Sequence, residues 1–146
     1  MKKWMIMLLW MLAAPVMILA AGTKVEAETS GEWEYEVTED ETVKILNYLG
    51  ENKEITVPQT LDNKMVTMVG DSVFSGDSNL VSVTIPEGVT TLGICCFENC
   101  SNLQRVDLPS TLTSLGGLNT FTDCISLTEI EIPENISSVG YRVFEG

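Results

Sequence analysis

The chain has 146 residues, enough for about one domain, and 21 acidic against 8 basic residues give it a formal net charge of −13. This charge disfavours nucleic acids and anionic membranes as partners, because both would repel it, and it is compatible with basic partners. The sequence contains no histidine, which excludes Ser-His and Cys-His catalytic pairs and removes a common zinc ligand. We therefore expect no cofactor and no metal site.

Residues 1–27 have the order of a secretory signal peptide, with two lysines, then an apolar run over 4–21, then small residues. We expect cleavage after Ala27, with Ala21 as a second candidate. An uncleaved membrane anchor is the alternative, since about 18 apolar residues lie near the lower limit for a membrane span. Cleavage after Ala27 removes three lysines and one glutamate and lowers the net charge to −15.

Residues 28–52 form an acidic segment, with seven carboxylates before the first basic residue, Lys44. Apolar and polar residues alternate over 33–37 and again over 43–48, with an acidic turn between these stretches. Such alternation predicts two half-buried strands.

Residues 53–146 repeat one pattern about four times, the last time incompletely. Prolines stand at 58, 86, 109 and 133, and phenylalanines at 74, 97, 121 and 144, the latter spaced by 23, 24 and 23 residues. The first proline interval is 28 residues, and an insertion at "LDNK" predicts a turn that restores the register. A period of this size is typical of a leucine-rich-repeat solenoid.

Each unit has the features of one coil. Val83 and Ile85, two positions apart, would share the inner face of a strand, whereas Ser82 and Thr84 would face outward. The following proline ends the strand, because it has no N–H to donate. A glycine four residues before each phenylalanine predicts a corner with positive φ or close backbone approach. We expect the phenylalanine inside the coil, within a short helical or 3-10 turn, so that stacked coils share a mostly β core.

The stretch "IPEGVTTLGICCFENC", residues 85–100, resembles the BspA-type (Treponema-type) leucine-rich repeats of bacterial surface proteins, and the resemblance extends over about residues 33–146. It implies a leucine-rich-repeat solenoid in which residues 28–52 include an N-terminal β-hairpin cap. It also implies a surface or secreted protein that binds proteins of a host matrix or neighbouring cells. Two departures are Cys96, where the family usually has alanine, and one extra residue in "GGLNTF".

The four cysteines invite a redox or metal interpretation. Cys100 and Cys124 occupy equivalent positions of adjacent units, so we expect them to stack at about one strand spacing, ~5 Å. A disulfide between them is conceivable, but burial as small apolar side chains is favoured. Of the neighbours Cys95 and Cys96, we expect Cys95 to be exposed. A zinc site is not expected without histidine or a CxxC pair.

The outward strand positions form the candidate binding surface, expected on the concave face and acidic apart from one arginine. They are Glu54, Thr56, Ser82, Thr84, Arg105, Asp107, Glu129 and Glu131. A solvated face that binds nothing is the alternative of equal weight. Asp107 and Glu131 could be imagined as an acid/base pair, but no burial or cleft is indicated, so we predict no enzyme.

We predict an exported, cell-surface or secreted protein-binding module of the adhesion type, without catalysis. The alternatives are a structural spacer, or the N-terminal part of a larger surface protein with an enzymatic domain downstream. We expect the last coil to expose Ile130, Ile132, Val143 and Phe144, and the protein to self-associate through this uncapped end.

Overall fold

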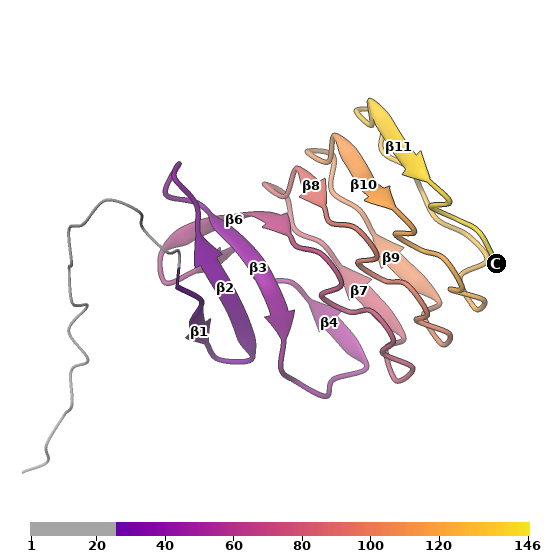
Figure 1. Cartoon of the computed structure of the whole chain (residues 1–146), viewed down its shortest axis with the longest axis horizontal. Coiled ribbons are helices and arrows are strands. Elements are labelled where there is room, and N and C mark those ends of the chain that lie inside the picture. Colours follow the sequence, from indigo (N-terminus) through magenta and orange to yellow (C-terminus); the bar gives the residue numbers. More distant parts are fainter. Residues whose placement is uncertain (1–25) are drawn as a thin grey trace, which may run out of the picture.

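The structure is a computed structural model that describes residues 26–146, so the apolar run and the cleavage site at Ala21 lie outside the described residues. Figure 1 shows this part of the chain as a stack of coils built from strands and turns. The prediction of short helical turns around each phenylalanine is wrong, because the chain there forms hydrogen-bonded turns and no helix. Within residues 26–146, no helix is long and apolar enough to cross a membrane.

Three antiparallel strands begin the fold: β1 (Glu28–Ser30), β2 (Trp33–Val37) and β3 (Val43–Tyr48). The two strands predicted over 33–37 and 43–48 are confirmed with these bounds. Strand β1 was not predicted, because its sequence Glu-Thr-Ser is polar throughout and forms a strand by pairing with β2. Strand β3 pairs in parallel with β6 (Lys64–Val69) of the first coil, so the hairpin continues one wall of the solenoid.

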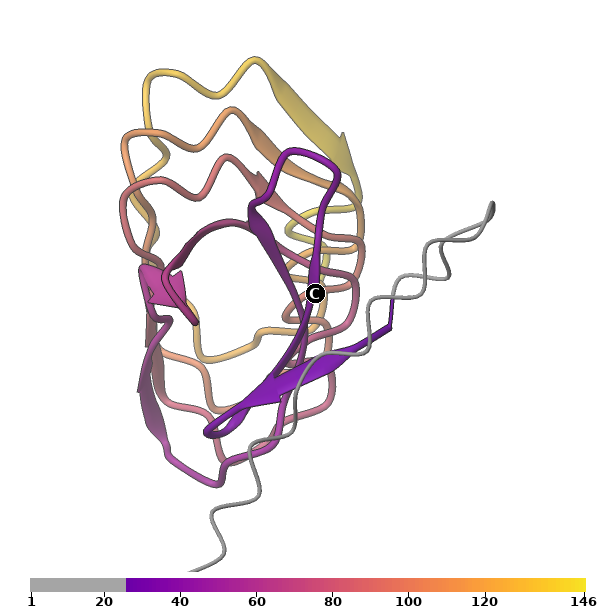
Figure 2. The same ribbon diagram turned by 90° about the vertical axis from the view of Figure 1, so that its left-hand side faces the viewer.

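Two parallel sheets line the coils. The small sheet contains β4 (Glu54–Thr56), β7 (Ser82–Thr84) and β9 (Arg105–Asp107), in that order. The large sheet continues from β3 through β6 (Lys64–Val69), β8 (Thr91–Leu92), β10 (Ser114–Leu118) and β11 (Ser138–Tyr141). Viewed along the stack in Figure 2, successive coils surround a common interior.

The insertion "LDNK" forms the predicted turn. Strand β5 (Thr60–Leu61) pairs antiparallel with the start of β6, and Asp62 and Asn63 join them with φ of 46° and 65°. Two consecutive residues with positive φ are typical of a two-residue hairpin turn, for which Asp and Asn are favourable. The insertion is therefore a hairpin that projects from the first coil without disturbing the repeat.

The large sheet within the coils was not predicted from the sequence. Its strands carry threonine, serine and glycine with little alternation, and the neighbouring coil supplies their hydrogen bonds. Thr90 N donates to Thr67 O at 2.9 Å, and Thr113 N donates to Thr90 O at 3.0 Å. Pairing between coils thus makes strands of segments whose own pattern is weak.

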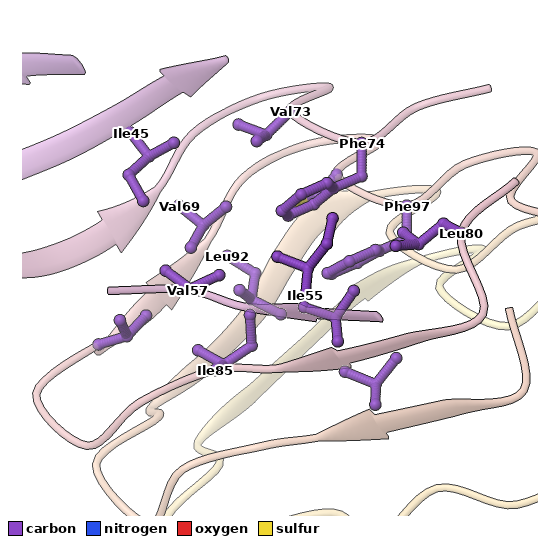
Figure 3. Close-up of a cluster of buried hydrophobic side chains, with 14 of the residues drawn as sticks. Ile45, Ile55, Val57, Val69, Val73, Phe74, Leu80, Ile85, Leu92 and Phe97 are labelled. Atoms are coloured by element: carbon purple, nitrogen blue, oxygen red, sulfur yellow. The ribbon is translucent and has the colours of Figure 1, made fainter. Parts of the chain in front are cut away.

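The phenylalanines stack along the interior, as expected. Ring centroids of Phe74 and Phe97 lie 5.1 Å apart, those of Phe97 and Phe121 5.2 Å, and those of Phe121 and Phe144 5.5 Å. Figure 3 shows Phe74 and Phe97 among the aliphatic side chains of both sheets. The first three rings are buried, whereas Phe144 is 49% exposed. The prediction that the phenylalanine lies inside its coil is therefore confirmed for three of the four coils.

The glycine four residues before each phenylalanine, at 70, 93, 117 and 140, has no positive φ, so this half of the prediction is wrong. Close backbone approach is confirmed at Gly93, where a Cβ would lie 2.3 Å from the carbonyl carbon of Gly70. A Cβ on Gly140 would lie 2.3 Å from the Gly117 oxygen. Coils meet too closely at Gly93 and Gly140 for any side chain, whereas a Cβ on Gly117 would contact only the Ile94 side chain at 3.4 Å, so neither half of the prediction holds there.

Left-handed backbone occurs instead two residues before and two residues after each phenylalanine. The positions are Ser72, Cys95, Asn119 and Arg142 before it, and Gly76, Asn99, Asp123 and Gly146 after it. The extra residue of "GGLNTF" adds Gly116, whose φ is 56°, and shifts the β10–β11 register between Leu115 and Leu118. A residue inserted in this way forms a bulge, which leaves the flanking pairs intact.

Candidate protein-binding face

The small sheet brings six of the predicted surface residues together in two columns. Glu54 aligns with Ser82 and Arg105, and Thr56 aligns with Thr84 and Asp107. The residues between these columns, Ile55, Val83 and Val106, are buried against the core. We call the six outward residues the small-sheet face: Glu54, Thr56, Ser82, Thr84, Arg105 and Asp107. The alternation read from the sequence is confirmed for these three strands.

The columns do not extend to Glu129 and Glu131. Both side chains are exposed, but residues 128–131 form no strand and do not pair with β9. Between the second and third coils, by contrast, Gln104 N donates to Val81 O and Ile85 N donates to Asp107 O, each at 2.9 Å. Glu129 and Glu131 therefore lie beside the small-sheet face rather than in it.

The polar contacts within the face centre on Asp107. Arg105 Nε donates to Asp107 Oδ1 at 2.8 Å, and Thr84 Oγ1 donates to Oδ2 at 3.3 Å. The carboxylate raises the pKa of Arg105 by accepting this bond and by its charge. Arg105, the one arginine of the small-sheet face, is thus paired with Asp107. The charges of the face that remain unpaired are negative.

A depression of about 680 Å³ lies between β9 and residues 128–131. Four carboxylates line it, those of Glu87, Asp107, Glu129 and Glu131, together with Arg105. Glu87 accepts hydrogen bonds from Ser110 N at 2.9 Å and Ser110 Oγ at 3.0 Å, and these bonds lower its pKa. Glu87 was missed because it follows a proline and precedes a turn. Glu87 stands one repeat period before Ser110, and this spacing could have indicated that the two residues are in contact.

A second depression, of about 500 Å³, lies over the outer side of the large sheet. Glycines and small hydroxyl residues make up much of its lining, with Ile94 and Val139 as exposed apolar members. It offers few groups that could orient a ligand, so the small-sheet face remains the stronger candidate.

The four cysteines are free, so no disulfide joins Cys100 to Cys124. Both are buried, and each thiol donates to the carbonyl of the phenylalanine one coil earlier: Cys100 Sγ to Phe74 O and Cys124 Sγ to Phe97 O, both at 3.0 Å. Burial raises the pKa of Cys100 to about 12 and that of Cys124 to about 11. These thiols stay neutral at physiological pH and are poor nucleophiles.

Cys95 is partly exposed and Cys96 is buried, as expected for adjacent residues. Burial and the nearby Glu98 raise the pKa of the Cys95 thiol as well. Among residues 26–146, no group of three or more histidine, cysteine, aspartate or glutamate side chains is arranged to hold a metal ion.

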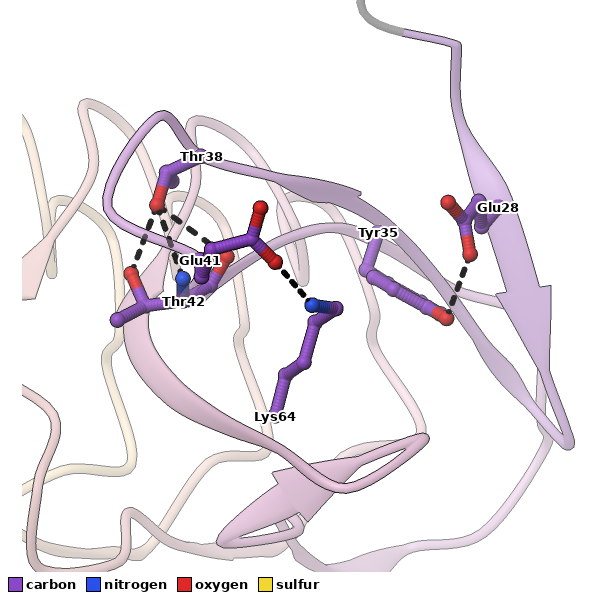
Figure 4. A network of polar contacts seen from close by, with 6 residues as sticks. All are labelled: Glu28, Tyr35, Thr38, Glu41, Thr42 and Lys64. Carbon is purple, nitrogen blue, oxygen red and sulfur yellow. Dashed lines mark hydrogen bonds and ion pairs between the residues drawn. The ribbon is translucent and has the colours of Figure 1, made fainter. Parts of the chain in front are cut away.

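A polar network links the N-terminal strands to the hairpin of the first coil (Figure 4). Tyr35 Oη lies 3.0 Å from Glu28 Oε2 and 2.6 Å from Asp62 Oδ2, so its single O–H can donate to either carboxylate. Burial and these two carboxylates raise the pKa of Tyr35. Lys64 and Glu41 form an ion pair nearby. The network connects β1, β2 and the "LDNK" hairpin.

The last coil exposes part of the apolar surface that the sequence predicts. Ile132 and Phe144 are exposed, as expected. Val143 is buried, which corrects the prediction, because the turn before Phe144 packs against the third coil and Val143 O accepts from Phe121 N. Ile130 is only partly exposed. Tyr141, 67% exposed, was missed because it lies outside the repeated apolar positions.

Comparison with known proteins identifies the family. The family described as "BspA type Leucine rich repeat region (6 copies)" matches residues 45–146. No curated protein matches the chain. The structure is similar to a leucine-rich-repeat protein from T. pallidum, with a TM-score of 0.76 and 29% identity, over 82% of this chain and 56% of that chain.

Two further structures are similar. A leucine-rich-repeat protein from Bacteroides capillosus has a TM-score of 0.70 and 26% identity, over 77% of this chain and 86% of that one. A leucine-rich cell surface protein from Faecalibacterium prausnitzii has a TM-score of 0.68 and 31% identity, over 83% of this chain and 33% of that chain. The chain thus spans about half of the T. pallidum structure and a third of that from F. prausnitzii. With the family match over more than half of its length, the chain belongs to the BspA-type leucine-rich-repeat family.

Proposed function

We propose that the chain is a protein-binding module of the adhesion type that acts at the cell surface or after secretion, without catalysis. BspA-type repeats are generally protein-interaction modules. One observation carries the proposal: six outward polar side chains, four exposed and two partly exposed, stand in two in-register columns above a buried apolar row. A regular polar surface on a packed sheet can meet a partner with little loss of conformational entropy.

The proposed partner is a protein with a basic surface, on a host matrix or a neighbouring cell. The net charge of −13 and the carboxylates around β9 support this chemistry, because opposite charge accelerates association and like charge prevents it. The same charges disfavour nucleic acids and anionic membranes.

Charge reversal at Asp107, in the small-sheet face, and at Glu131, beside it, tests this function. Asp107→Lys combined with Glu131→Lys should weaken saturable binding of the purified chain to matrix or cell-surface protein by about tenfold or more. Glu39→Lys, an exposed change in the turn between β2 and β3, is the matched control and should bind like the unchanged chain. Equal binding by all three proteins would remove the small-sheet face as the binding surface.

Export is proposed from the leader-like residues 1–27, and the cell-surface description of the F. prausnitzii protein supports it. The lack of histidine and the raised thiol pKa values support a function without catalysis. Brief protease treatment of intact native cells, followed by mass spectrometry, should release peptides from residues 28–146. Recovery only after the cells are lysed would contradict surface exposure.

A structural role within a longer surface protein is the second candidate. The F. prausnitzii structure supports this candidate, because that protein is a cell surface protein of which this chain covers only a third. The intact mass of the protein from native cells distinguishes the two roles. A mass well above that of residues 28–146 would favour a spacer or an N-terminal part, including one joined to an enzymatic domain.

Self-association is proposed through the exposed apolar residues of the last coil, including Ile132, Tyr141 and Phe144. Light scattering at rising concentration should show dimers or larger particles, and Phe144→Glu should reduce them. A monomer at every concentration would contradict this part of the proposal.

A further inference from the structure

We propose that strand β9 binds an extended, basic segment of the protein partner as an added strand, within the gap between β9 and residues 128–131. This gap, which we call the β9 gap, is the depression of about 680 Å³ described above. The inference rests on the proposed protein-binding function and specifies how the partner binds and what chemistry its segment has.

The first argument is the backbone of β9. Strand β7 pairs with β4 on one side and β9 on the other, whereas among the described residues 26–146 β9 pairs with β7 alone. In the second coil, Ile85 N donates to Asp107 O of the next coil. The equivalent donor in the third coil, Leu108 N, has no backbone acceptor within residues 26–146. Since successive residues of a parallel strand bond to opposite neighbours, the N–H and C=O of Val106 also point toward the gap.

The second argument is that the opening is local. On the other side of the same two coils, β10 pairs with β11 through Ser114 with Ser138 and Leu115 with Val139. The rings of Phe121 and Phe144 remain parallel, with an interplanar angle of 3°. The third and fourth coils therefore stay joined at the large sheet and at the phenylalanine turn, and separate only at β9.

The third argument is charge. Glu87 and Asp107 lie on one side of the gap and Glu129 and Glu131 on the other, against Arg105 alone, which Asp107 already engages. Alternate side chains of an added strand point to the same face, so basic residues two positions apart would face these carboxylates. Main-chain hydrogen bonds would supply affinity, and the carboxylates would select the sequence, as in other cases of strand addition.

A designed peptide tests both elements of the proposal. The probe is fluorescent Lys-Val-Lys-Val-Lys-Val-Lys, added to the purified chain at low ionic strength and followed by anisotropy. A second peptide has the same charges but carries N-methyl groups on alternate amides, and a third replaces each lysine by glutamate. We expect saturable binding of the first, binding at least about tenfold weaker for the methylated peptide because ladder bonds are lost, and none for the acidic peptide.

Variants of the chain locate the site. Glu129→Lys with Glu131→Lys should weaken binding of the basic peptide by about tenfold, since it reverses the charge of one side of the gap. Glu39→Lys with Asp40→Lys, in the exposed turn between β2 and β3, is the matched control with the same change of net charge and should change binding by less than about twofold, because this turn lies outside the small-sheet face and the gap. Hydrogen exchange at the amides of Val106 and Leu108 should slow when the peptide is bound.

Three results would overturn the inference. They are absence of saturable binding by the basic peptide, equal binding of its methylated form, and an effect of the Glu39→Lys, Asp40→Lys control as large as that of the Glu129→Lys, Glu131→Lys change. The last two would leave the proposed function in place, because a basic partner would then bind the surface without adding a strand. Failure of the matrix or cell-surface experiment alone would instead remove the proposed function.

Discussion

The two ends of the phenylalanine stack carry the same residue in different surroundings. Phe74, the first ring, is 2% exposed, and the rings of Trp33 and Tyr48 lie 6.3 Å and 6.0 Å from it. Phe144, the last ring, stacks on Phe121 at 5.5 Å but is 49% exposed. Stacking is therefore nearly constant along the solenoid, whereas enclosure depends on what lies beyond each ring.

This difference shows what a repeat position can and cannot contribute. Each coil provides one wall for the ring of the next coil, so an interior phenylalanine is enclosed by its two neighbours. At the N-terminal end the second wall comes from Trp33 and Tyr48, which stand outside the repeat. The contacts support the predicted role of the hairpin as a cap, which stays a prediction.

The largest expected effect compares an interior ring with the exposed one. Phe97→Ala removes a fully buried ring from between two others, and should lower the free energy of unfolding by about 3–5 kcal/mol. Phe144→Ala should cost about 1 kcal/mol, because half of the ring is already in water. Urea titration of both variants measures the difference. Equal losses would show that burial does not distinguish the two ends.

Removal of the N-terminal cover should have the next largest effect. Trp33→Ala takes away the ring that packs edge-on against Phe74 and should lower the free energy of unfolding by about 3 kcal/mol. Tyr141→Ala, at the exposed end, is the control and should change it by less than about 0.5 kcal/mol. A neutral Trp33→Ala variant would contradict a capping role for the hairpin.

Alkaline pH should destabilise the fold through its buried thiols. Their pKa values in the folded state, about 12 for Cys100 and about 11 for Cys124, lie above the usual thiol value of about 8.5. This contribution to stability is complete below the unfolded pKa and is lost as pH rises toward the folded values. We expect each of the two thiols to account for a loss of about 2 kcal/mol between about pH 9 and pH 10.5.

Single replacements should separate the interior thiol from the outer one. Cys100→Ala should flatten the alkaline fall in unfolding free energy more than Cys124→Ala, because Cys100 is the more completely buried. The measurement is the free energy of unfolding as a function of pH for the three proteins. An unchanged slope in both variants would show that other groups cause the loss.

The smallest effect concerns local backbone strain, which should not depend on enclosure. Cys95 has φ of 54°, and the equivalent position in the next coil holds Asn119 with φ of 52°. Because asparagine tolerates this conformation, Cys95→Asn should stabilise the fold by about 0.5 kcal/mol. Cys95→Val should destabilise it by about 1 kcal/mol or more, since β-branched residues fit this region poorly. Thermal unfolding of both variants measures whether asparagine at position 95 gives the more stable protein. A stabilising Cys95→Val change would contradict this prediction.

Sequence periodicity predicted much of the fold because the repeat records packing directly. The spacing of Phe97 and Phe121 gives the length of a coil, and the pair Val83 and Ile85 gives the buried side of a strand. Periodicity was less informative for the candidate site. It placed Glu129 and Glu131 as a further rung of the small-sheet face, because it cannot report whether two neighbouring coils remain hydrogen-bonded.

The sequence by itself determined the number and length of the coils, the inward residues of β4, β7 and β9, the hairpin strands and the turn at the insertion. These features depend on local patterns of burial and on residues such as proline and Asp-Asn, whose preferences act within a few positions. Only the tertiary structure decided that a second sheet forms, which of the two predicted alternatives holds at the glycines, and that the ladder opens beside β9. These features depend on contacts between residues about one coil apart, whose distance and hydrogen bonds the linear sequence does not specify.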